Sequence, residues 1–259
     1  MIKLSAEAII RSQARKALQN NYSTAVIGFV ILLLPLFIYS GFESVVIYLL
    51  PALISYSSIS NIVSLFSVMT ALLLISVFLS PLMNGFIRMF YVNCCTGKMD
   101  IKDVFFYMSK DKYVKTLHLN LSFVLRMLIP GLLAYSPVVL YVILIDKLYS
   151  DLSKSFLYND FYLILFILST MILVLWSLKY FLVFTLYAEN ESAPVKKLFT
   201  LSKSIMKSHS ASASKLIFSY APWMLLSFLI LPLIYVVPYM TQGLCIGAKW
   251  MTRTSLEVK

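Results

Sequence analysis

Basic residues are concentrated in alternate connecting segments between the apolar runs of this chain. Sixteen of the 22 Lys and Arg residues lie in the N-terminal segment, around residues 97–116, around 188–213 and in the C-terminal segment. The other connecting segments hold only Lys147 and Lys154. Proteins threaded repeatedly through a membrane keep Lys and Arg in their cytoplasmic loops. The pattern therefore predicts a multi-pass protein of the cell membrane with both termini in the cytoplasm.

The composition agrees with a chain that is partly solvated by lipid. Hydrophobic residues make up 60% of the sequence and charged residues 13%, whereas soluble domains carry about 25% charged residues. The net charge of +11 is explained by cytoplasmic loops that face anionic lipid headgroups. No stretch interleaves basic and aromatic residues in the manner of a nucleic-acid groove. We therefore expect membrane lipids with anionic headgroups on the cytoplasmic side as partners, and no nucleic acid.

The apolar runs predict an all-α, polytopic fold of six transmembrane helices arranged as three hairpins. The last run is too long for one crossing of the ~30 Å hydrocarbon layer, so we expect a hairpin there, with its turn near Leu231–Pro232. Proline inside a membrane helix usually bends it, which predicts kinks at Pro81, Pro130 and Pro238, with a further proline at Pro137. The predicted spans are 23–41, 61–95, 117–145, 161–187 and two within 214–252.

Cytoplasmic amphipathic helices are expected in residues 1–22, after Asp103 as a helix cap, and in residues 194–209. The last of these has the clearest pattern, with lysines on the opposite face. Its apolar face is predicted to comprise Val195, Leu198, Phe199, Ser202, Ile205 and Met206. Such a pattern is typical of a helix that lies in the membrane interface.

The order of these segments indicates a single membrane domain, residues 1–259, with an internal repeat. A cytoplasmic amphipathic segment precedes a hairpin in residues 1–97, 98–190 and 191–259. The Pro81–Gly85 step of the first hairpin resembles the Pro238–Gly243 step of the third. The alternative to duplication is the independent use of Pro and Gly in membrane helices.

Several motifs, taken in order, give the chain a family resemblance. They are Ala14–Tyr22, the Pro81 and Gly85 step, Asp103–Phe106, Tyr187–Ser192, Leu201–Lys207 and Val237–Tyr239. In these the chain resembles the uncharacterised bacterial membrane family catalogued as domain of unknown function 975. It departs from the family at Ser208, where the family usually has Gly. The resemblance implies a six-helix integral membrane protein with no established activity, and it supplies no catalytic residues.

Three basic residues fall inside the predicted spans and form the candidate anion-binding or lipid-binding site. Arg88, Arg126 and Lys179 each lie eight or nine positions from the cytoplasmic end of a span, which is roughly 12–14 Å inward at the helical rise. No acidic residue is expected at that depth. Charged residues in spans usually face an interior or a water-filled cavity, which suggests a vestibule for an anion or a lipid phosphate. The alternative is that these side chains snorkel to the headgroups.

Gly243 and Gly247 form a small-residue motif that permits close helix approach. We expect it to serve packing within the protein, with a dimer seam as the alternative. His118 and His209 lack carboxylate or cysteine companions at ligand spacing. We therefore expect no metal, no cofactor and no catalytic residue.

The expected function is that of a non-enzymatic membrane protein that interacts with anionic lipid or with a protein partner. The partner would be a second copy of the chain, another membrane protein or a cytoplasmic protein. The alternative is a small permease or an accessory component of a transport system, since bent helices and internal repeats are common in transporters.

Overall fold

The computed structural model describes residues 5–35, 79–148, 156–226 and 230–257, and every regular element in these ranges is helical. The all-α prediction is confirmed for this part of the chain. The elements are α1 (Ala6–Gln19), a helix at Tyr22–Pro35, a helix at 79–96, η1 (Ile101–Met108), α4 (Lys110–Leu148), α5 (Phe156–Ser177), η3 (Leu178–Tyr180), α6 (Val183–Glu189), α7 (Val195–Phe218), α8 (Ala221–Leu226) and α9 (Ile230–Glu257).

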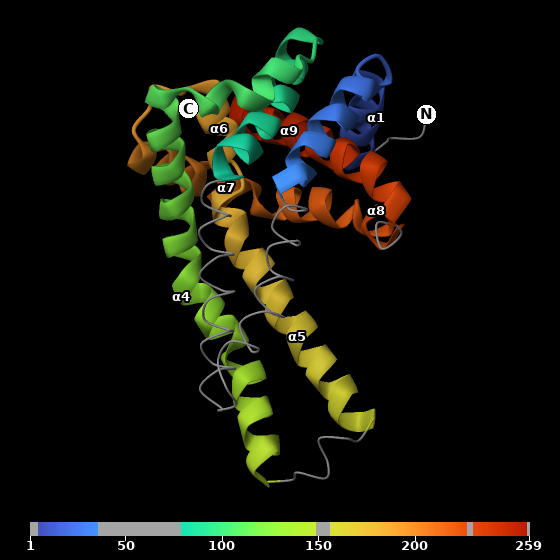
Figure 1. Cartoon of the computed structure of the whole chain (residues 1–259), viewed down its shortest axis with the longest axis vertical. Helices are drawn as coiled ribbons and strands as arrows, with labels where there is room; N and C mark the ends of the chain where they lie inside the picture. The colour runs from blue at the N-terminus through green and yellow to red at the C-terminus, as the bar shows by residue number, and fades with distance from the viewer. Residues whose placement is uncertain (1–4, 36–78, 149–155, 227–229, 258–259) are drawn as a thin grey trace, which may run out of the picture.

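A long hairpin of α4 and α5 extends from a compact head that contains α1, η1, α6, α7, α8 and α9 (Figure 1). The two helices pack on each other through Tyr135, whose hydroxyl lies 2.9 Å from the Thr170 hydroxyl. Its ring lies 5.6 Å from that of Phe166. Small buried residues, including Ala134 and Ser169, line the hairpin. Most of the large apolar side chains of the hairpin point outward, as expected for helices solvated by lipid.

Two helices in the described ranges are long and apolar enough to cross a membrane. They run from Lys110 to Tyr141 and from Asp160 to Glu189. A third span is added if α1 and Tyr22–Pro35, which meet at 93°, are counted as one broken helix. The predicted spans 23–41 and 61–95 lie partly outside the described residues. The six-span topology therefore stays a prediction.

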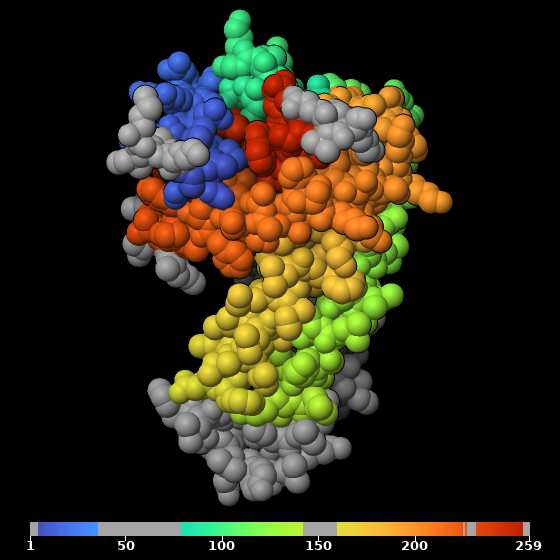
Figure 2. All heavy atoms as spheres, turned by 180° about the vertical axis from the view of Figure 1, so that it is seen from behind, coloured from blue at the N-terminus to red at the C-terminus, as the bar shows by residue number. Residues whose placement is uncertain are grey.

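A helix is present over the segment predicted at residues 194–209, and as α7 it continues to Phe218. All six residues of the predicted apolar face are buried. They pack within the head, where α7 contacts η3, α6 and α9. The expectation that this face lies in the membrane interface is therefore wrong, because the chain itself covers the face. Figure 2 shows α7 lying across the point where the hairpin joins the head.

The turn expected near Leu231–Pro232 stays a prediction, because residues 227–229, between α8 and α9, lie outside the described residues; Leu231 and Pro232 themselves lie in the first turn of α9. Proline is tolerated there, since an N–H at the start of a helix has no helical acceptor. The helix that follows α7 is the short helix α8, which begins after a break of two residues from Phe218.

The other prolines lie within helices. Pro130 and Pro137 lie inside α4, Pro238 lies inside α9, and Pro81 lies in the helix at 79–96. All three helices continue through these positions, and the kinks stay predictions.

The helix at 79–96 packs closely against the backbone of η1 at Gly85. A Cβ atom at Gly85 would lie 2.9 Å from the Asp103 carbonyl oxygen and still closer to that of Val104. Asp100 caps η1 by accepting a hydrogen bond from the Lys102 N–H at 3.0 Å, and Asp103 lies in the first turn. The expectation that Asp103 is the cap is therefore wrong by one turn. The close backbone approach fixes Asp103 beside the helix that carries Arg88.

A network of side-chain amides joins the end of α1 to the helix at 79–96 and to α9. Asn93 donates to Gln242 of α9 at 2.9 Å, and Asn21 donates to Asn93 at 3.1 Å. The Asn21 amide is also within 3.2 Å of the Ala17 and Gly97 carbonyl oxygens. Both Asn93 and Gln242 are buried. Since buried polar groups stabilise a fold only when they are paired, this network fixes the bend between α1 and Tyr22–Pro35.

The two glycines of the small-residue motif lie where α9 passes the end of α7. A Cβ atom at Gly243 would lie 2.8 Å from Cζ of Tyr220 and in closer contact with its hydroxyl. At Gly247 it would collide with a methyl group of Leu216. Both contacts are within one chain.

We therefore predict that Gly243→Ala destabilises the protein by about 1–3 kcal/mol, the usual cost of overpacking. The thermal melting midpoint in detergent measures the change. Gly131→Ala is the matched control, because no neighbouring atom lies within 4 Å of its added methyl group. The control should gain stability by up to ~1 kcal/mol, since alanine favours helix. Equal midpoints for the two variants would contradict the packing described here.

Candidate functional site

Arg88 does not lie in an unpaired cationic band. Its Nε lies 3.4 Å from the Asp103 carboxylate, and its Nη1 pairs with the Glu191 carboxylate. The guanidinium also lies over the Phe106 ring, 3.5 Å from its centroid. The expectation of no acidic residue at this level is therefore wrong for Arg88. Its charge is already compensated by groups from η1 and from the loop that precedes α7.

Glu191 is the centre of this cluster. Lys112, at the start of α4, lies 2.9 Å from its second carboxylate oxygen, and Lys115 donates to its backbone carbonyl oxygen. The Lys112 ammonium also lies 3.2 Å from the centroid of the Phe106 ring. The Glu191 side chain is only 27% exposed. The cluster joins four segments of the chain and has a structural role.

A tyrosine pair lies beneath the cluster. The rings of Tyr107 and Tyr187 stack with centroids 4.8 Å apart, and the Tyr187 hydroxyl lies 3.0 Å from that of Thr116. Burial raises the pKa of Tyr107, which keeps its hydroxyl neutral. That hydroxyl has no hydrogen-bond partner among the described residues. The pair therefore acts as apolar support for the ion pairs above it.

Arg126 has different surroundings. It is exposed on α4, donates to the Ser122 carbonyl oxygen at 2.8 Å, and lies 4.0 Å from the centroid of the Phe199 ring of α7. Within the described ranges, no carboxylate forms an ion pair with it. Its charge is therefore held at a fixed place and is free to meet an anion.

Lys179 lies in η3, the short helix that follows α5. Its ammonium lies 3.4 Å from the centroid of the Trp176 ring, and its carbonyl oxygen accepts a hydrogen bond from Ser202 of α7 at 3.0 Å. The next residue, Tyr180, packs edge-on against Phe199 at 5.4 Å. No ion pair to Lys179 occurs among the residues described. The structure thus brings Arg126 and Lys179 to one face of α7 and leaves Arg88 elsewhere.

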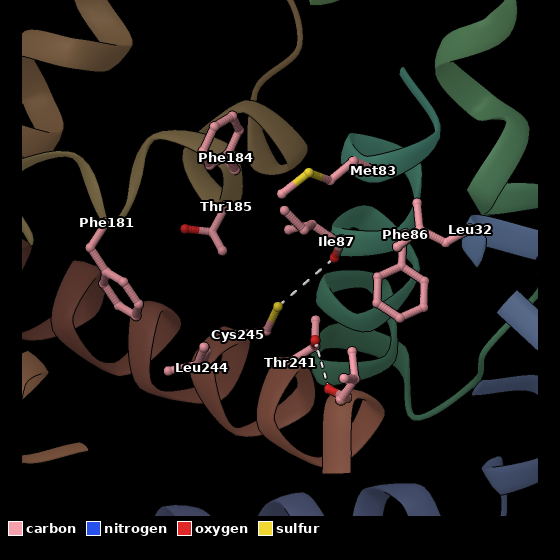
Figure 3. A pocket seen from close by; sticks show the side chains of 11 residues that line it. Leu32, Met83, Phe86, Ile87, Phe181, Phe184, Thr185, Thr241, Leu244 and Cys245 are labelled. Atoms are coloured by element: carbon pink, nitrogen blue, oxygen red, sulfur yellow. Dashed lines mark hydrogen bonds between the residues drawn. The ribbon is translucent and has the colours of Figure 1, made fainter. Parts of the chain in front are cut away.

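An apolar cavity of about 280 Å³ lies between the helix at 79–96, α6 and α9 (Figure 3). The hydroxyls on its wall are turned to their own helices. Thr185 donates to the Leu182 carbonyl oxygen at 2.9 Å, and Thr241 to that of Val237 at 2.8 Å. The Cys245 thiol points to the Ile87 carbonyl oxygen at 3.8 Å. The cavity offers contacts to an apolar group and no group for acid–base chemistry.

The described ranges contain no group of three or more His, Cys, Asp or Glu residues that could hold a metal ion. His209 packs against Trp250 with ring centroids 6.0 Å apart. His118 is exposed on α4. The part of the chain that the structure describes thus presents cationic and apolar surfaces.

The comparisons give a family and add no activity. Residues 4–246 match the family described as "Protein of unknown function (DUF975)", and the chain belongs to that family. The curated proteins contain no significant match. The solved structures contain none either.

The charge cluster gives a testable contrast between its two carboxylates. Glu191→Gln leaves Arg88 and Lys112 with less compensation, so we expect a loss of about 1–2 kcal/mol in stability for these partly exposed groups. Asp103→Asn should cost less than ~1 kcal/mol, because the amide oxygen still accepts from Arg88. Thermal melting in detergent at neutral pH compares the two variants. A larger loss for Asp103→Asn would contradict the central place of Glu191.

The pH dependence of Asp103 follows from its burial. Burial raises the pKa of Asp103, although Arg88 opposes the shift. A carboxyl whose folded-state pKa is raised favours the fold when protonated, and this contribution is lost as pH rises from the unfolded value of ~3.9 through the folded one. We expect the melting midpoint of the wild type to fall relative to that of Asp103→Asn over this interval. A difference that is constant with pH would show that the pKa is not raised.

Proposed function

We propose that this chain is an integral membrane protein that binds anionic lipid headgroups with Arg126 and Lys179, on the cytoplasmic side of the cell membrane. The proposal is supported by the place of these two cations on the hairpin. Each lies where its helix changes from an exposed apolar surface to a surface covered by the head.

The change in exposure carries the proposal. Between Leu128 and Leu140 of α4, the large outward-facing apolar side chains are 49–69% exposed. Before Arg126, Thr116 and Leu119 are fully buried, while Val114, Leu121 and Leu125 are still 43–67% exposed, so the head covers one side of α4 there. On the other helix, apolar side chains are exposed from Phe161 to Trp176, whereas after Lys179 the chain becomes buried from Leu182 to Ala188. The two cations therefore lie at the boundary between a surface suited to lipid tails and the packed head.

The length of the hairpin beyond the cations fits a bilayer. From Arg126 to Leu148, and from Phe156 to Lys179, the rise of a helix gives roughly 33–35 Å. The hydrocarbon layer is about 30 Å thick. With the hairpin spanning this layer, Arg126 and Lys179 lie at the depth of the headgroups. This geometry favours the alternative in which the helices extend beyond the bilayer, so that no charge lies in mid-membrane.

The chemistry of the two side chains suits a lipid phosphate. A guanidinium can bind two phosphate oxygens at once, and an ammonium adds a point charge. The rings of Phe199 and Trp176 restrain the two cations from one side. The exposed Lys196 and Lys203 on α7 add positive charge to the same side of the head. Arg88 is left out of the site because two carboxylates compensate it.

Only the α4–α5 hairpin needs to cross the bilayer for this site to work. The six-span topology and the cytoplasmic position of both termini stay predictions, which residue-by-residue cysteine labelling from each side would test. The small-permease alternative is tested by solute flux in proteoliposomes.

Native mass spectrometry of the gently extracted protein tests the lipid site. In Arg126→Gln/Lys179→Gln, we expect the affinity for an anionic phospholipid to fall roughly 30-fold, since each basic residue near an anionic surface contributes about 1 kcal/mol. The matched control is Lys102→Gln/Arg253→Gln, which removes the same charge from exposed positions outside the site. Lipid binding that is equal in the two variants would overturn the proposal.

A further inference from the structure

A second basic groove lies at the bend between α1 and Tyr22–Pro35. It has a volume of about 770 Å³, and its polar wall includes Ser12, Arg15, Lys16 and Gln19 of α1. Tyr22 and Tyr235 form its aromatic wall. We propose that this groove binds the headgroup of an anionic phospholipid. The site depends on the protein being in a membrane and is independent of Arg126 and Lys179.

The polar residues of the groove lie on one strip of α1. Their spacing of three, four and seven positions from Ser12 places them on the same helix face. Ile10, Ala14 and Leu18 are buried, and α1 packs against α9. Because this packing fixes α1, the polar side chains of the strip start from a rigid support. The hydrogen-bond donors of the groove are therefore pre-organised for a ligand.

The two cations of the groove are available to a ligand. Arg15 and Lys16 are exposed, and neither forms an ion pair with any residue that the structure describes. Arg11, one turn earlier, is different, because it donates to the Ser219 carbonyl oxygen at 3.2 Å. A guanidinium and an ammonium on adjacent residues bind phosphate oxygens well. The Ser12 hydroxyl and the Gln19 amide can bond to the polar groups of a headgroup.

The aromatic wall indicates a lipid rather than a soluble anion. The rings of Tyr22 and Tyr235 lie 5.6 Å apart, and Trp223 lies 6.4 Å from Tyr235. Tyrosine and tryptophan are enriched at the depth of the headgroups in membrane proteins. The exposed cation pair can therefore bind the phosphate of a lipid, while the aromatic wall beside it contacts the glycerol region of the same lipid molecule.

The bend between α1 and Tyr22–Pro35 also indicates that the groove lies at the depth of the lipid headgroups. α1 carries exposed charges, whereas the helix at Tyr22–Pro35 is apolar, and the two meet at 93°. If α1 lies along the membrane surface, the second helix points into the hydrocarbon. The groove at the bend then opens at the level of the headgroups. Basic pockets at this level are known places for anionic lipids.

Binding of short-chain phosphatidylglycerol, followed by native mass spectrometry, tests the groove. Arg15→Gln/Lys16→Gln should bind the lipid at this site roughly 30-fold more weakly, with the Arg126 and Lys179 site unchanged. Measuring the variant in an Arg126→Gln/Lys179→Gln background isolates the groove. Lys102→Gln/Arg253→Gln in that background is the charge-matched control. Unchanged lipid binding in the groove variant would overturn the proposal, whether or not the hairpin site binds lipid.

The source of the phosphate is tested in the same background. Glycerol 3-phosphate presents a phosphate and glycerol without acyl chains, and we expect it to bind much more weakly than phosphatidylglycerol. Tyr235→Leu removes the aromatic wall and should weaken lipid binding while the cations remain. Equal binding of glycerol 3-phosphate and the lipid would assign the groove to a soluble phosphate compound and overturn the lipid proposal.

Discussion

α7 packs against η3, α6 and α9 at the same time, and the positions of both candidate lipid sites depend on that packing. Six of its eight buried residues have large apolar side chains. Each such side chain stabilises the fold by about 1.5–3 kcal/mol when fully buried. Through Phe199 and Ser202, α7 fixes the point where the α4–α5 hairpin leaves the head. Leu216 of α7 contacts α9 at Gly247. α1 packs against α9 as well.

The basic residues of the chain divide into two kinds according to what surrounds them. Arg88 and Lys112 are compensated by carboxylates and lie over one aromatic ring, so they hold segments of the head together. Arg126 and Lys179 also lie over rings but have no carboxylate beside them among the described residues. An ammonium or guanidinium over an aromatic face is oriented without being neutralised. This difference separates structural cations from those available to an anion.

Much of the helical architecture could be predicted from local pattern, whereas the charge cluster could not. The apolar face of α7 follows directly from its helical spacing, and its six expected residues are buried. The exact place of the turn before α9 could not be predicted, because a proline that breaks a helix and one that starts a helix, as Pro232 does in α9, look alike in sequence. Arg88 and Glu191 are 103 positions apart, and no local spacing indicates such a contact. The same holds for Arg126 and Phe199, which only the packing of α7 brings together.

The bend at Asn21 has a mechanical consequence. Asn21 ties the junction of α1 and Tyr22–Pro35 to Asn93 and to the Gly97 carbonyl oxygen, so the two helices move as one rigid lever. Membrane helices adjust their tilt when the bilayer becomes thicker or thinner. If Tyr22–Pro35 lies in a membrane, a change in its tilt would act through this junction on the whole head, because α1 is packed on α9. In that case, bilayer thickness would act on the packing of the head through the hydrogen bonds of one asparagine side chain.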